Sequence, residues 1–107
     1  MNFRNFNIFN FFRGNSSKNI KKEIRYKDIV IRLYNYKIED SITCESNIEA
    51  FDLDNNLLWV AENCANGRYF EMQIDESNDQ LEANSGSGMR YEIELKNGKI
   101  SRQYLIK

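Results

Sequence analysis

The 107-residue chain carries 15 Lys and Arg residues against 16 Asp and Glu residues, and 41% of its residues are hydrophobic. This size supports one domain with a single core, and the apolar content predicts a folded chain rather than a disordered one. Histidine is absent, which removes the commonest general base, the histidine-dependent triads and most zinc sites. We therefore expect a protein that is not an enzyme and that needs no cofactor or metal.

The formal charge of −1 hides a segregated distribution. Residues 1–38 contain nine basic and two acidic side chains, a net charge of +7. Residues 39–95 contain two basic and 14 acidic side chains, a net charge of −12, and residues 96–107 contain four basic and no acidic ones. Such segregation bears on partners and association rates rather than on fold. It indicates a partner of opposite charge, unless the charges of the chain meet each other across the folded sheet.

The first 13 residues hold five of the seven phenylalanines, interleaved with Asn and Arg. This stretch has no unbroken apolar run, so it differs from a signal peptide, and it is too short and polar to span a bilayer. The spacing of Phe3, Phe6 and Phe9 is compatible with a short helix. We expect the segment to dock its rings on the sheet or to stay partly disordered, rather than to bind a membrane. Residues 14–17 are predicted to form a turn or linker.

Alternating apolar and polar residues begin at Ile20 and predict strands over residues 20–27 and 29–36. Lys on both faces of the first of these is typical of an edge strand. Alternation places Tyr34 and Tyr36 outward, as interface candidates. A polar, acidic loop over residues 37–46 precedes a hairpin formed by residues 47–51 and 57–62. Trp59 lies in a stretch that is apolar on both faces, so we expect a strand buried on both sides with Trp59 packed in the core. The alternative is that Trp59 is an exposed aromatic anchor at an interface.

Further strands are predicted over residues 69–75, 80–84, 90–95 and 99–106, separated by turns rich in Asn, Asp, Ser and Gly. Phe70 is expected to point inward and Tyr69 outward. The predicted fold is all-β, an antiparallel meander of seven to eight short strands, half-barrel or propeller-like. It forms a single domain over residues 1–107, with the Phe-rich segment in residues 1–18 and the sheet in residues 19–107.

If these strands pair in order, their outward side chains converge on one acidic face. We predict that this face binds a basic protein partner, helped by electrostatic steering. The alternative is a solvated face balanced by nearby Lys. The predicted partner-binding residues are those that alternation or loop position places there: Tyr69, Glu71, Gln73, Asp75, Glu82, Arg90, Glu92 and Glu94, with Glu39, Asp40, Asp52 and Asp54 extending the face.

Three other site types find less support. Cys44 and Cys64 suit reduced thiols in a cytoplasmic protein, a single bridge between them being the alternative. The acid-rich turn after Phe51 lacks the Gly and the bidentate Glu of a calcium loop. Basic residues near Tyr26 and Tyr34 leave nucleic-acid binding as an alternative, but the acidic remainder of the chain would repel a polyanion, so we expect none.

Several short motifs resemble a family of small bacterial all-β proteins with propeller-like hairpin repeats. They are Ala50-Phe51-Asp52, Asn56-Leu57-Leu58-Trp59, Leu81-Glu82-Ala83-Asn84, Ser85-Gly86, Tyr91 and Asn97-Gly98-Lys99-Ile100. In build the chain is similar to half-barrel immunity proteins of contact-dependent growth inhibition systems. The resemblance implies a cytoplasmic immunity protein that binds and neutralises a cognate toxin domain. A basic toxin such as a nuclease would match the acidic face; a β-sheet scaffold that forms homodimers is the alternative.

Overall fold

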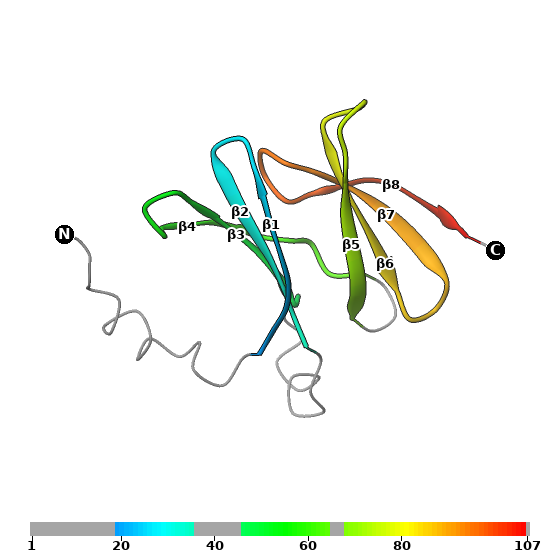
Figure 1. Ribbon diagram of the computed structural model, residues 1–107. Coiled ribbons are helices and arrows are strands. Elements are labelled where there is room, and N and C mark those ends of the chain that lie inside the picture. The colour runs from blue at the N-terminus through cyan, green and yellow to red at the C-terminus, as the bar shows by residue number, and fades with distance from the viewer. Residues whose placement is uncertain (1–18, 36–45, 65–67, 107) are drawn as a thin grey trace.

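The computed structural model describes residues 19–35, 46–64 and 68–106 (Figure 1). These ranges contain strands and turns and no helix. The strands pair in chain order into two four-stranded antiparallel sheets, neither of which closes into a barrel. The first sheet contains β1 (Ile20–Tyr26), β2 (Ile29–Tyr34), β3 (Ile48–Asp52) and β4 (Leu57–Val60), and the second contains β5 (Tyr69–Asp75), β6 (Gln80–Ser85), β7 (Met89–Glu94) and β8 (Ile100–Leu105). The predicted all-β antiparallel meander is confirmed, whereas the expected helix near Phe3 lies outside the described residues.

The hairpins turn where the sequence places residues that tolerate a left-handed backbone. Asn55 in the β3–β4 turn has a φ of 69°, and Gly88 and Gly98 in the last two turns have φ values of 89° and 77°. Asp52 supports the β3–β4 turn from its first position, because its Oδ1 accepts hydrogen bonds from the backbone N–H groups of Asp54 and Asn56, each at 2.9 Å. The Asn-rich stretch after Asp52 is therefore a turn closed by its own acidic residue.

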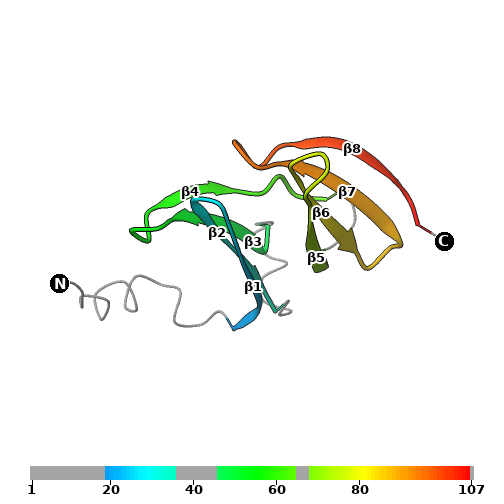
Figure 2. The ribbon, with the colours of Figure 1, turned by 45° about the horizontal axis from the view of Figure 1, so that its top comes forward.

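Figure 2 shows the two sheets, whose inner faces share one hydrophobic core. Tyr69 and Tyr91 of the second sheet are buried in this core, with ring centroids 5.6 Å apart and an interplanar angle of 86°. This edge-to-face arrangement is one that aromatic pairs favour. Side chains from both sheets complete the core: Ile31, Leu33, Ile48, Ala50, Trp59, Met72, Leu81, Ala83 and Ile93.

Asn47 fastens the first sheet to the second at one end of this core. Its buried side-chain Nδ2 donates to the backbone oxygens of Tyr34 at 2.8 Å and of Tyr69 at 2.7 Å. Its Oδ1 accepts from the backbone N–H of Tyr69 at 3.1 Å. One amide side chain thus satisfies the end of β2 and the start of β5, and residues 22 apart in the sequence are held together away from solvent.

Trp59 makes a second junction on the other side of the core. Its indole Nε1 donates to the backbone oxygen of Leu95 at 2.8 Å, and its ring lies against Gly98 in the β7–β8 turn. Beside it, the backbone N–H of Glu62 donates to the oxygen of Gly98 at 2.8 Å. The prediction that Trp59 packs in the core is confirmed, since it is only 8% exposed. The expectation that its strand is buried on both sides is wrong, because Leu58 and Val60 are 47% and 42% exposed on an edge strand.

Two tyrosines predicted to point outward are buried. Tyr69 is only 1% exposed. A register shift between Tyr69 and Glu71 makes Phe70 an extra residue in β5, so the side chain of Tyr69 points to the core instead of to solvent. Phe70, expected inside, is 50% exposed. Tyr34 is 4% exposed because the interior strand β2 is buried on both faces, and burial, followed by the charge of Glu49, raises the pKa of its phenol.

Candidate functional site: the outer face of the second sheet

The outward side chains of β5 to β8 form rows that run across the second sheet. In one row Gln73 pairs with Glu82 and Glu82 pairs with Glu92, which in turn pairs with Arg102. This strand register brings the outward side chains together on one face, as the alternation of the sequence predicted. We call this surface the outer face; its members are Glu71, Gln73, Asp75, Gln80, Glu82, Asn84, Arg90, Glu92, Glu94, Arg102 and Tyr104.

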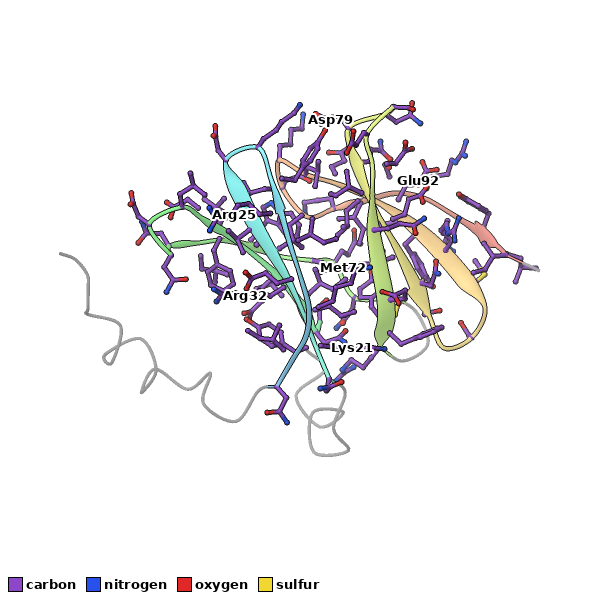
Figure 3. All side chains as sticks on the ribbon, viewed as in Figure 1. Lys21, Arg25, Arg32, Met72, Asp79 and Glu92 are labelled. Atoms are coloured by element: carbon purple, nitrogen blue, oxygen red, sulfur yellow. The ribbon has the colours of Figure 1, made fainter. Side chains whose placement is uncertain are left out.

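Arginines neutralise the centre of the outer face. Glu82 and Glu92 lie directly opposite each other, an arrangement of like charges that costs stability when nothing compensates it. Arg90 Nη1 lies 3.8 Å from Glu82 Oε1, and Arg102 Nη2 lies 3.2 Å from Glu92 Oε2. The two carboxylate side chains are only 15% and 16% exposed. Two of the five outward acids, of which Glu92 is labelled in Figure 3, are thus partly covered and paired with cations of their own sheet.

A third acid, Glu71, joins the two sheets. Its Oε1 accepts from Lys22 Nζ of β1 at 3.2 Å and from the backbone N–H of Met72 at 3.0 Å. The Met72 N–H first and Lys22 second hold the pKa of this carboxyl below its ordinary value. Lys22 also donates to the backbone oxygen of Met72 at 2.6 Å. The register places Glu71 on the outer face, but its carboxylate already forms an ion pair with Lys22 that links β5 to β1.

The remaining acids form one end of the outer face. Asp75 and Glu94 flank Gln80 in the last row of the sheet, and exposed Glu76 follows Asp75 in the turn. Asp75 accepts from Asn78 Nδ2 at 2.8 Å, and Glu94 accepts from Asn97 Nδ2 at 3.1 Å. Among the residues that the structure describes, none of these three carboxylates has a Lys or Arg within ion-pair distance. We call Asp75, Glu76 and Glu94 the acidic end.

The other predicted site residues do not extend the outer face. Asp52 and Asp54 lie in the β3–β4 hairpin of the first sheet, at the side of the molecule away from β5 to β8 (Figures 1 and 2). Hydrogen bonds from Asn56 hold the pKa of the Asp52 carboxyl below its ordinary value. Tyr69 is in the core, which corrects its predicted exposure. Glu39 and Asp40 lie outside the described residues.

Most of the basic side chains of β1 and β2 make internal contacts. Lys21 Nζ donates to the backbone oxygen of Phe70, and Lys27 Nζ lies 3.0 Å from Asp79 Oδ1. Arg32 Nε lies 2.9 Å from Glu23 Oε1 and its guanidinium stacks 4.8 Å from the centroid of the Phe51 ring. The cations considered as a nucleic-acid surface are thus largely engaged in holding the fold together.

Sequence reasoning missed an apolar patch on the β3–β4 hairpin. Leu53, Leu57, Leu58 and Val60 are 57%, 54%, 47% and 42% exposed. A register shift between Ala50 and Phe51 gives β4 an extra residue opposite β3. The signal available in the sequence was the run of four apolar residues from Leu57 to Val60, which reads equally well as a buried strand.

The geometry defines a class: an all-β protein of two open antiparallel meanders, one of which carries a polar, acid-rich outer face. Within residues 19–35, 46–64 and 68–106, no group of three or more Cys, Asp or Glu side chains is placed to hold a metal ion, and no helix there could cross a membrane. The chain belongs to the family described as domain of unknown function DUF7957, whose model matches residues 15–105. No curated protein and no solved structure matches it.

Proposed function

We propose that this protein is a protein-binding domain that engages a basic partner through the outer face of the second sheet. The observation that carries the proposal is the acidic end, where Asp75, Glu76 and Glu94 form no ion pair with a Lys or Arg of the described residues, and Asp75 and Glu94 accept hydrogen bonds from Asn side chains of their own turns. A partner that brings Lys or Arg to this end gains attraction without breaking an existing ion pair. Asp75 and Glu94 end their strands and are hydrogen-bonded to Asn78 and Asn97, so these two side chains lose little conformational freedom on binding.

The finer proposal is that the partner is a toxin domain and that binding neutralises it. Its support is the similarity in build between this chain and half-barrel immunity proteins of contact-dependent growth inhibition systems. A nuclease toxin fits this role, since its cleft must attract phosphate and so attracts carboxylates as well. Within the described residues the acidic end would then meet the basic cleft, while the neutralised centre of the face supplies shape and hydrogen bonds.

A binding measurement tests the proposal directly. The full chain is titrated with a purified basic toxin domain taken from the product of a neighbouring gene, at salt concentrations from about 50 to 500 mM, a range over which exposed charges become screened. The variant Asp75→Asn with Glu94→Gln removes two charges and keeps the hydrogen-bond acceptors of the turns. Its matched control is Asp28→Asn with Asp54→Asn, which removes two exposed charges from hairpins of the first sheet.

We expect the first variant to raise Kd by roughly 3- to 30-fold at low salt, on the scale of two exposed charge pairs, and to bind with less salt dependence. The control should change Kd by less than about twofold, within the range of weak surface effects. Equal effects of the two variants, or a Kd indifferent to salt, would rule out the acidic end as the docking surface. Absence of binding at any salt would remove the toxin as partner.

A further inference from the structure

β8 forms a free edge of the second sheet. The strand order ends at β8, and Figure 2 shows it as the upper rim of that sheet, with no described strand beyond it. The other sheet edges have neighbours, because Lys21 and Lys22 of β1 donate to backbone oxygens of β5, and the N–H of Glu62 after β4 donates to the oxygen of Gly98. Leu105 of β8 is 66% exposed, so this edge is open to solvent. An open strand edge invites pairing with another strand.

The backbone of β8 has two positions that face away from β7. The N–H of Ile106 donates to the oxygen of Gly88 at 3.0 Å, so position 106 faces β7. Antiparallel ladders alternate, and Tyr104 therefore faces β7 as well. The N–H and C=O groups of Gln103 and Leu105 point outward. Within the described part of the chain, no hydrogen bond reaches these outward groups.

The regular part of β8 is symmetric about Tyr104. A register shift at Ser101 ends it on one side, so residues 102–106 are regular, and the two outward positions lie one residue before and one residue after Tyr104. Two copies related by a two-fold axis at Tyr104 would pair Gln103 of each copy with Leu105 of the other through backbone hydrogen bonds. Tyr104 would lie opposite Tyr104 of the second copy in a non-hydrogen-bonded pair, where side chains are closest.

The side chains of β8 favour a second copy as the occupant of this edge. β8 contains no acid, and its one cation, Arg102, is neutralised by Glu92 of its own chain at 3.2 Å. Two copies can therefore pair without bringing unpaired charges together, whereas a strongly charged strand finds no free counter-charge there. The guanidinium of Arg102 lies 5.2 Å from the centroid of the Tyr104 ring, so the copies would meet through residue types that dominate interface energetics. On the other face, the exposed Leu105 side chains would reach each other diagonally.

We propose that the protein forms a two-fold symmetric homodimer in which the β8 strands of two copies pair antiparallel about Tyr104. The pairing joins the two second sheets into one continuous sheet with both outer faces on the same side, because the axis is perpendicular to the sheet. The acidic end stays free, since Glu94 ends β7 whereas residues 102–106 lie beside residues 88–92. The dimer therefore goes beyond the proposed binding of a basic partner and does not depend on it.

Sedimentation equilibrium of the full chain, from about 10 μM to 1 mM, measures the association. A single edge pairing buries less than a standard interface of about 1,600 Å², so we expect a weak dimer with a Kd of about 10–500 μM. Leu105→Lys should raise Kd at least about tenfold, because it brings like charges together and removes an apolar contact. The matched control Leu58→Lys makes the same exchange at an exposed leucine of β4 and should leave Kd within about twofold of the unmodified value.

Amide hydrogen exchange in the same samples, followed by NMR, locates the contact. The amides of Gln103 and Leu105 should exchange roughly two- to sevenfold more slowly at the highest concentration than at the lowest, as the dimer fraction rises. The amides of Tyr104 and Ile106 face β7 and should be protected at every concentration, which reports that the strand is folded. In Leu105→Lys this concentration dependence should be lost while the protection of Tyr104 and Ile106 remains.

Three results would overturn the proposal. The first is a single monomeric species at about 1 mM, a concentration above the whole expected range of Kd. The second is a dimer that Leu105→Lys weakens no more than Leu58→Lys does, which would place the interface away from β8. The third is exchange of the Gln103 and Leu105 amides that does not slow with concentration, which would mean that this edge is not where the copies meet.

Discussion

Gly98 should be the least replaceable of the glycines in the described turns, because two separate costs meet there. Its φ of 77° lies in the left-handed region, where a side chain strains the backbone. A Cβ at this position would lie 2.5 Å from Trp59 Cε3 and 2.8 Å from Trp59 Cδ2. Gly88 has a similar φ of 89° but no heavy atom within 4 Å of its hypothetical Cβ, and Gly86 has neither feature. Comparing alanine substitutions at these three glycines therefore distinguishes the cost of backbone strain from the cost of steric overlap.

The expected magnitudes follow from these distances. A left-handed Ala costs roughly 1 kcal/mol, so Gly88→Ala should lower the free energy of unfolding by about that amount. Gly98→Ala adds overpacking against a ring that the Leu95 carbonyl holds in place, which costs about 1–3 kcal/mol more. Its total loss is therefore about 2–4 kcal/mol. Gly86→Ala should stay within about 0.5 kcal/mol of the unmodified chain, as surface substitutions usually do.

Urea unfolding followed by fluorescence measures these differences, because Trp59 is the only tryptophan and lies at the junction concerned. The order of stability should be Gly86→Ala, then Gly88→Ala, then Gly98→Ala, with similar m values. At a few degrees per kcal/mol for a domain of this size, Gly98→Ala should melt about 8 °C or more below the unmodified chain. If Gly98→Ala and Gly88→Ala were equally stable, Trp59 would not press on this turn and the second junction between the sheets would be wrong.

Two further predictions concern the first junction and the acid range. Asn47→Ala should lower the free energy of unfolding by about 2–5 kcal/mol, because it removes the hydrogen-bond partners of buried backbone groups of Tyr34 and Tyr69. Thermal melting measures this loss, with Asn78→Ala in an exposed turn as the control. Equal melting temperatures of the two variants would contradict the prediction. The pKa of Glu71 is lower in the folded state than in the unfolded chain. Its contribution to the free energy of unfolding is therefore fully present above its unfolded pKa of about 4 and is lost as pH falls through the folded pKa. The melting temperature should drop more steeply below about pH 4 in the unmodified chain than in Glu71→Gln, and parallel pH profiles would refute this.

The turns and the strand order could be predicted from sequence because they depend on local chemistry. Asp52 closes its own turn through backbone N–H groups two and four residues away, and Gly98 supplies the left-handed φ that its turn requires. The convergence of Glu82 and Glu92 followed from alternation alone, since both strands keep their register at that row.

What sequence could not predict depends on single-residue shifts and long-range partners. One extra residue at Phe70 reversed the expected facing of Tyr69, and nothing local marks that bulge. The pairing of Arg102 with Glu92 requires knowing that β8 lies beside β7 in one particular register. The exposure of Leu58 and Val60 follows from the position of β4 at an edge, which is a property of the whole sheet rather than of its residues.

The ion pairs also change what the charge of the sequence means for binding. Residues 39–95 carry a net charge of −12, but Glu71, Asp79, Glu82 and Glu92 each pair with a Lys or Arg in the described structure. The attraction available to a basic partner is therefore concentrated at the acidic end rather than spread over the face. A partner drawn by charge should approach along the β5–β6 and β7–β8 turns, and the salt dependence of binding should reflect about three carboxylates, each screened as an exposed charge is.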